Sequence, residues 1–198
     1  IDLPDDLRPD FDKALLRIEK AGQRCKTIAI NLLTFARQHD ATVAMERVDL
    51  ADVVQRSTDL LTDQCRAHGI ALRCDVPAGL VVWGNANQLQ QVVTNIALNA
   101  VLEMTRGGSL EIRAQKAGNR SVLVEIIDSG SGIAEKHLGK IFDPFFSTKP
   151  VGKGTGLGLS IVYGIVETHR GEVWVDSRPG EGCTFRVKLP AQPRSSRR

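Results

Sequence analysis

Apolar residues recur at alternating spacings of three and four from residue 10 to about residue 38. They form one seam: Leu15, Ile18, Gly22, Cys25, Ala29, Leu32 and Ala36. This spacing is typical of a helix that packs in a helical bundle. Further apolar residues widen the face beyond one seam, so a lone helix could not bury it. The pattern predicts a long helix that packs against partner helices, followed by a linker at residues 37–41.

From about residue 43 the pattern changes to shorter helices and alternating strands. Helices are expected at residues 50–67, 85–104 and 157–168. The first should turn Val53, Val54, Leu60 and Leu61 inward, and the second should begin at an Asn85 cap. Strands are expected at residues 70–76, 110–116, 122–128, 172–177 and 183–189. Because strands and helices mix without regular βαβ alternation, the α+β class is predicted.

The segment Asp128-Ser129-Gly130-Ser131-Gly132-Ile133 places one carboxylate at the end of an apolar strand. Such a carboxylate can accept a hydrogen bond from the amino group of adenine. Alternatively, it can simply open a turn through its side chain. The two glycines permit tight turns and close approach of the backbone to a ligand.

A second glycine-rich segment, residues 152–160, leads directly into a helical pattern. Glycine lets backbone N–H groups approach phosphates closely, and a helix N-terminus favours anions. Upstream, Asn95 and Asn99 lie four residues apart on one helix face, where two amide oxygens could reach one metal ion. One glycine-rich stretch alone is a weak signal, but these blocks in this order indicate a nucleotide site.

In this order the blocks resemble the ATP-binding domain of the sensor histidine kinases, within the GHKL ATPase superfamily. The resemblance covers about residues 10–190. It rests on segments similar to the N, G1, F and G2 boxes and to the closing strand of the family: 88–100, 128–133, 141–149, 152–160 and 180–190. The stretch Phe142-Asp143-Pro144-Phe145-Phe146 is most similar to the subgroup that includes nitrogen-regulation sensors.

The resemblance implies a Bergerat-type ATP-binding α/β sandwich, in which a mixed sheet carries helices on one face. ATP and Mg²⁺ are the implied cofactors. Asp128 would hold adenine with help from Thr184, and Lys149 or Lys153 would reach the γ-phosphate unless they are simply solvated. Asn99 is the preferred Mg²⁺ ligand and Asn95 the second. The other implied ATP-binding residues are Gly130, Gly132, Ile133, Gly154, Thr155, Gly156, Leu157 and Gly158.

Asn95 bears on the class of reaction. Gyrase-type and chaperone-type ATPases of the superfamily have Glu where Asn95 stands, and that Glu acts as a general base. An amide cannot accept a proton at neutral pH, so Asn95 argues against activation of water and favours a histidine acceptor. Transfer of the γ-phosphoryl group to a neutral imidazole would then rest on positioning and charge neutralisation.

The predicted long helix resembles the second helix of the family's dimerisation domain, where two helical hairpins form a four-helix dimer. In the family the first helix carries the phosphorylated histidine, and here residues 1–9 look like the interhelical loop. None of the four histidines stands on an early helix: His39, His68, His137 and His169. The sequence is therefore expected to be a piece of a longer protein, without its phosphoacceptor and without an assigned catalytic residue.

Three regions are predicted: a partial dimerisation domain (1–40), an ATP-binding catalytic domain (41–190) and a disordered basic tail (191–198). The net charge of +3 comes from the three arginines of the tail. Other basic residues are scattered without interleaved aromatic residues, which argues against nucleic-acid binding. The four cysteines show no CxxC pair, so free thiols in a reducing cytosol are expected, with Cys25 and Cys183 as small core residues.

The sequence is therefore interpreted as the cytoplasmic kinase core of a two-component sensor histidine kinase. The expected partners are a second kinase subunit and the receiver domain of a response regulator, which accepts the phosphoryl group on an aspartate. Membrane attachment would come only through segments of the parent protein. Two alternatives stay open: a non-catalytic nucleotide-sensing scaffold, and a serine kinase of the anti-sigma type, which the long N-terminal helix disfavours.

Overall fold

The computed structural model describes residues 10–19, 21–22, 44–149 and 155–192. The chain divides into two compact units. One comprises residues 1–41 and 148–155, and the other comprises residues 42–147 and 156–198. In the first unit, residues 10–19 and 21–22 are helical, as the seam predicts. The rest of that helix, the linker and most of the basic tail lie outside the described residues, so the domain limits stay predictions.

A five-stranded sheet forms the centre of the second unit. Its order is β2 (Ile70–Asp75), β4 (Gly108–Lys116), β5 (Ser121–Asp128), β7 (Cys183–Pro190) and β6 (Glu172–Ser177). The pair β2–β4 is parallel and the other three pairs are antiparallel. The sheet is therefore mixed, and the predicted strands and α+β class are confirmed.

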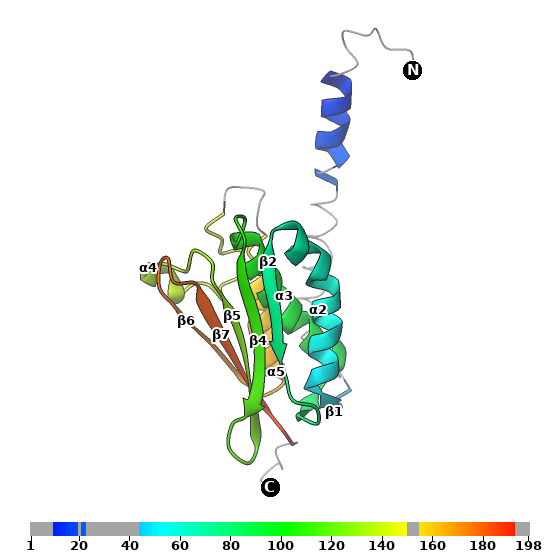
Figure 1. Ribbon diagram of the computed structural model, residues 1–198, viewed down its shortest axis with the longest axis vertical. Coiled ribbons are helices and arrows are strands. Elements are labelled where there is room, and N and C mark those ends of the chain that lie inside the picture. The colour runs from blue at the N-terminus through cyan, green and yellow to red at the C-terminus, as the bar shows by residue number, and fades with distance from the viewer. Residues whose placement is uncertain (1–9, 20, 23–43, 150–154, 193–198) are drawn as a thin grey trace. The chain divides into compact units, whose positions relative to one another are not determined.

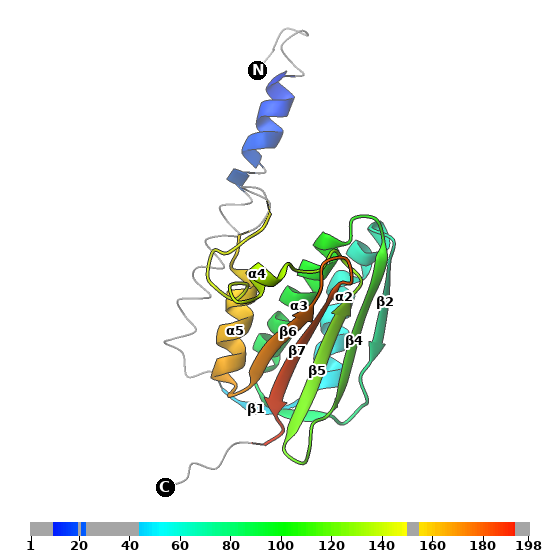
Figure 2. The same ribbon diagram turned by 90° about the vertical axis from the view of Figure 1, so that its left-hand side faces the viewer.

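Three helices cover one face of this sheet: α2 (Leu50–Ala67), α3 (Ala86–Glu103) and α5 (Gly158–Thr168). Figure 2 shows the sheet in front of α2 and α3, with α5 next to β6, and Figure 1 shows the two layers edge-on. Every second residue of β5 and β7 is buried, because side chains alternate between the two faces and only one face is covered. The predicted arrangement of helices on one face is confirmed.

The helix starts follow the local sequence. The Asp49 carboxylate accepts the N–H of Ala51 at 2.9 Å at the start of α2. The predicted cap of α3 is confirmed, because the Asn85 side chain accepts the N–H of Gln88 at 3.1 Å. The prediction that Leu60 faces inward is wrong. Leu60 is 60% exposed, since it lies on the outer side of α2, whereas Leu61 is buried.

Three short elements were not predicted from the sequence. The strands β1 (Glu46–Asp49) and β3 (Val81–Gly84) pair antiparallel in a separate two-stranded sheet, and α4 (Glu135–Leu138) is a single turn. Four residues are too few to show a period. None of the helices in the described part of the chain has the length and apolar character needed to cross a membrane.

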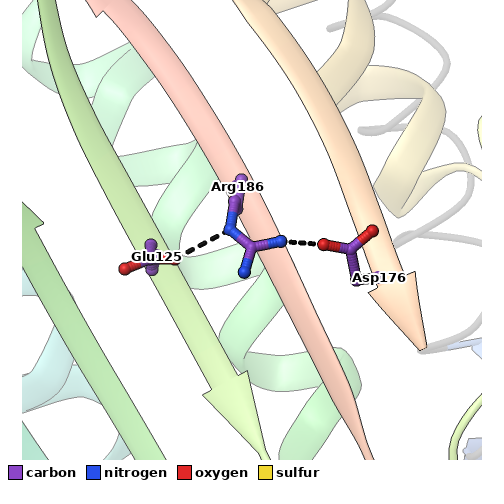
Figure 3. A network of polar contacts seen from close by, with 3 residues as sticks. All are labelled: Glu125, Asp176 and Arg186. Atoms are coloured by element: carbon purple, nitrogen blue, oxygen red, sulfur yellow. Dashed lines mark hydrogen bonds and ion pairs between the residues drawn. The ribbon is translucent and has the colours of Figure 1, made fainter. Parts of the chain in front are cut away.

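The face of the sheet away from the helices carries charged side chains. Arg186 on β7 lies between Glu125 on β5 and Asp176 on β6, and its Nε donates to Glu125 at 2.8 Å (Figure 3). Pairing of Arg186 with both acids, over three neighbouring strands, neutralises charge where the sheet is not covered. The nucleotide-binding residues predicted from β5 and α3 belong to the other side of the sheet.

Candidate nucleotide-binding site

The two asparagines of α3 lie beside the first turn of α5. The Asn95 Nδ2 donates to the carbonyl oxygen of Gly158 at 3.2 Å. A Cβ atom on Gly158 would lie 3.7 Å from the Asn99 Nδ2, so both amides border the same turn. Because Asn95 uses its amide nitrogen on Gly158, its Oδ1 faces elsewhere. Amide oxygens are ligands that Mg²⁺ accepts, so this pair fits a metal bound together with phosphates.

The entry to α5 is fixed by a close backbone contact with the F-box segment. The N–H of Phe145 donates to the carbonyl oxygen of Gly156 at 2.9 Å. Gly156 has a φ of +66°, and a Cβ there would lie 2.4 Å from the Phe145 carbonyl carbon. Phe145 itself has a φ of 66°. Only glycine fits at residue 156, and this contact sets the direction of the N–H groups that follow.

At the other end of the site, Asp128 is the last residue of β5 and is buried on the helix side of the sheet. Its carboxylate accepts the N–H of Gly130 at 2.8 Å. A Cβ on Gly130 would lie 2.8 Å from the same carboxylate oxygen, so a side chain there would displace the Asp128 carboxylate. Burial raises the pKa of the Asp128 carboxyl, and hydrogen bonds from Gly130 and Cys183 oppose that rise. The carboxylate keeps further lone pairs for a ligand.

The loop after Asp128 rests on the turn that joins β6 to β7. The N–H of Gly180 donates to the carbonyl oxygen of Ser131 at 2.8 Å. Gly132 has a φ of +70°, and a Cβ there would lie 2.0 Å from the Arg178 carbonyl oxygen. The Ile133 N–H donates to the Ser177 hydroxyl at 2.8 Å. The predicted G1 residues are therefore held by a second, distant segment.

The structure places Cys183, and not Thr184, beside Asp128. Asp128 pairs with Cys183 across β5 and β7, and both side chains are on the buried face. Thr184 pairs with Ile127 and belongs to the opposite face, so the sheet does not bring its side chain to Asp128. Burial raises the pKa of the Cys183 thiol to about 11, which keeps it a neutral donor. Its predicted core position is confirmed, whereas Cys25 lies outside the described residues.

Helix α3 joins the two ends of the site. A Cβ on Gly130 would lie 3.7 Å from the Cβ of Glu103, the last residue of α3. Asn95 and Asn99 are on the same helix, eight and four residues earlier. At 1.5 Å per residue, the base end and the asparagines are separated by about 6 to 12 Å along α3. That spacing suits a ligand with a base at one end and phosphates at the other.

The structure does not determine where four predicted site residues lie relative to this arrangement. Lys149 and Thr155 belong to the first unit, and Lys153 and Gly154 lie outside the described residues. Their predicted roles stay predictions. Two residues of the site were missed, Ser177 and Cys183. Strand alternation could have identified Cys183, but nothing local to Ser177 indicates that it meets a loop 44 residues away.

His169 is a structural residue at the end of α5. It is 3% exposed, its Nδ1 lies 2.8 Å from the Ile165 carbonyl oxygen, and its Nε2 accepts the N–H of Asn85 at 2.9 Å. Both contacts fit only the neutral ring protonated on Nδ1. Burial lowers the pKa of His169 accordingly. This histidine therefore locks α5 to the start of α3 and offers no nitrogen to a phosphoryl group.

Comparison with known proteins gives the family of the chain. Residues 84–193 match the family described as histidine kinase-, DNA gyrase B-, and HSP90-like ATPase, and the chain belongs to that family. The sensor kinase CckA of Brucella abortus is 36% identical in an alignment 193 residues long, which covers 89% of this chain and 20% of CckA. The chain therefore spans about a fifth of that relative's length.

Solved structures give the same class. The catalytic domain of the histidine kinase ThkA matches with a TM-score of 0.69 and 29% identity, over 76% of this chain and 99% of that one. ThkA in complex with the response regulator protein TrrA matches with a TM-score of 0.77 and 25% identity, over 98% of this chain and 54% of that one. The fold and the family are those of a sensor-kinase ATPase domain, as the sequence predicted.

Proposed function

We propose that this chain binds Mg²⁺-ATP between α3, the loop after β5 and the start of α5, and that it serves as the kinase core of a sensor histidine kinase. The observation that carries the proposal is that the loop after Asp128 meets the C-terminal end of α3, one to two turns along that helix from the two asparagines beside α5. Membership of the ATPase family supports nucleotide binding. The choice of residues within the site is our own inference.

The adenine end would be formed by Asp128. Its carboxylate accepts one hydrogen bond from Gly130 and retains lone pairs for the amino group of adenine. Guanine carries a carbonyl oxygen at the corresponding position, and that oxygen would face the carboxylate as a second acceptor. Burial strengthens this discrimination, because neither group could turn to water instead.

The phosphate end would be formed by the first turn of α5. The apolar Leu157 stands at its N-cap, so no side chain caps the helix from there. Backbone N–H groups at a helix start and the positive end of its dipole favour an anion. Mg²⁺, when bound, would neutralise phosphate charge, with Asn99 as its preferred protein ligand and Asn95 as the second. Lys149 and Lys153 stay candidates for the γ-phosphate.

The proposed reaction is transfer of the γ-phosphoryl group to a histidine of a dimerisation helix, and then to an aspartate of a response regulator. Asn95 supports this choice, because its amide donates to Gly158 and cannot remove a proton from water. The complex of ThkA with its response regulator TrrA supports a partner of that kind. Both steps concern a whole sensor kinase, and this chain spans about a fifth of the length of CckA.

Titration calorimetry with Mg²⁺-ATP and Mg²⁺-GTP tests the site. We expect ATP to bind at least about tenfold more tightly than GTP, because a hydrogen bond to a charged group is worth about 1.5–3 kcal/mol. Asp128→Asn should weaken ATP binding by a similar factor, and Asn99→Ala should remove most of the Mg²⁺ dependence. Asp63→Asn is the matched control, since Asp63 is an exposed carboxylate on α2. Equal affinities for ATP and GTP would contradict the role of Asp128.

A further inference from the structure

Ser177, the last residue of β6, stands where three segments meet. Its hydroxyl accepts the N–H of Ile133 at 2.8 Å and donates to the carbonyl oxygen of Gly182 at 2.7 Å. The same oxygen lies 3.3 Å from the Cys183 sulfur. The Ser177 hydroxyl therefore joins the loop after β5, the turn before β7 and the first residue of β7.

This hydroxyl serves one backbone donor and one backbone acceptor at once. A serine hydroxyl has one proton and two lone pairs. The proton is donated to Gly182, a lone pair accepts from Ile133, and the Cys183 sulfur lies beside the same oxygen. An apolar side chain at residue 177 would leave the Ile133 N–H and the Gly182 carbonyl without this partner.

Cys183 connects this arrangement to the carboxylate at the base end. Cys183 pairs with Asp128 across β5 and β7, and hydrogen bonds from its backbone N–H and its thiol oppose the rise in the pKa of the Asp128 carboxyl. Gly182 approaches Asp128 from the same turn, since a Cβ on Gly182 would lie 2.0 Å from the Asp128 carbonyl oxygen. A change in the turn at residues 177–182 would therefore move the donors that orient Asp128.

We propose that Ser177 is a positioning residue for adenine binding, which holds the loop at residues 130–133 and the Cys183 donors in register with Asp128. The inference rests on the proposed nucleotide site and adds a residue outside the motif segments. Ser177 acts through Ile133 and Cys183 and makes no contact with the nucleotide itself. Its removal should loosen the base end of the site and leave the phosphate end, at Asn99 and α5, unchanged.

The test is titration calorimetry on Ser177→Ala, with Mg²⁺-ATP and Mg²⁺-ADP. We expect both affinities to fall by about tenfold, the range for hydrogen bonds whose partly buried partners are left unsatisfied. The ratio of the two affinities should stay as in the wild type, because the γ-phosphate is bound elsewhere. Ser177→Thr, which keeps the hydroxyl on a β-branched residue suited to a strand, should restore most of the affinity.

A double-mutant cycle with Asp128→Asn separates positioning from general loss of stability. If Ser177 acts through Asp128, Ser177→Ala should cost much less in the Asp128→Asn background than in the wild type. Thr62→Ala is the matched control, because it removes a hydroxyl that bonds a backbone carbonyl on α2; it should leave ATP binding unchanged.

The outcomes are distinguishable. A wild type that binds no ATP would overturn the proposed function and this inference with it. Normal wild-type binding with an unchanged Ser177→Ala affinity would overturn the role of Ser177 alone. Equal losses from Ser177→Ala in both backgrounds would show that the residue stabilises the fold without positioning Asp128, which also contradicts the inference.

Discussion

Single glycines decide whether the loop after β5 can reach its place. Gly132 has a positive φ and faces the Arg178 carbonyl, and Gly130 lies against the carboxylate of Asp128. A Cβ added at either position would lie closer to its neighbour than Cβ atoms do in real structures. The loop after β5 can therefore lie this close to the β6–β7 hairpin because Gly132 has no side chain.

Gly132→Ala tests this fit against a control with the same backbone conformation. Gly118 has a φ of +73° with no neighbour within 4 Å of an added Cβ. Gly118→Ala should therefore lower the free energy of unfolding only by the cost of a left-handed alanine, about 1 kcal/mol. Gly132→Ala adds a collision with the Arg178 carbonyl and should cost roughly 2–4 kcal/mol. Chemical denaturation measures both. Equal losses for the two variants would contradict the close packing of loop and hairpin.

The local conformation of single residues could be predicted where it depends only on the neighbouring sequence. Asp128, Gly130 and Gly132 occupy a strand end and tight turns, as their segment indicated. Thr184 was selected by resemblance, but its neighbour Cys183 is on the face of Asp128. Neighbouring residues of a strand point to opposite faces of the sheet. Choosing between Cys183 and Thr184 therefore required the register of β5 with β7.

Between elements, α3 is the part that organises the site. Asn95 and Asn99 meet the start of α5, Glu103 meets the loop after β5, and Asn85 is held by His169 at the end of α5. Long helices with clear periods and caps were predictable, and α2, α3 and α5 appear as expected. The strands β1 and β3 were not, because four-residue strands depend on a partner distant in sequence.

The buried His169 makes the α3–α5 contact sensitive to acid. Burial places its pKa in the folded protein below the unfolded value of about 6.5. As the pH falls below about 6.5, the unfolded chain therefore takes up the proton first. The stability from His169 is complete above that pH and is lost as the pH falls towards the folded pKa. A protonated ring would also place an N–H against the N–H of Asn85.

Chemical denaturation between pH 8 and pH 5.5 measures this effect. The free energy of unfolding of the wild type should fall towards the acid end of the range. His169→Gln should be less stable at pH 8 and should show a flatter pH profile. His68→Gln, at the C-cap of α2, serves as control and should keep the wild-type slope. An unchanged slope in His169→Gln would contradict the neutral buried ring.

At the scale of the whole molecule, the N-terminal helical segment bears an uncovered apolar face. Phe11, Leu15, Leu16 and Ile18 are 40%, 48%, 53% and 68% exposed. Apolar side chains at this spacing on a helix favour packing against other helices. The sequence predicted this need for partners from the same seam, although most of the seam lies outside the described residues.

We therefore expect the chain to self-associate weakly through this segment. Sedimentation at increasing protein concentration should show a rising mass, and Leu15→Asp with Ile18→Asp should keep the chain monomeric. Arg17→Gln changes an exposed polar residue of the same helix and should not reduce association. A wild type that stays monomeric at the highest attainable concentration would contradict the bundle interpretation of the seam.

The central claim is that one Mg²⁺-nucleotide spans the site from Asp128 to the start of α5. A crystal structure of the chain with ADP and Mg²⁺ tests it most directly. We predict the adenine amino group about 3 Å from the Asp128 carboxylate. The phosphates should lie at the first turn of α5, with the metal on the Asn99 amide oxygen. A nucleotide bound elsewhere, or an adenine ring that does not meet Asp128, would contradict the account.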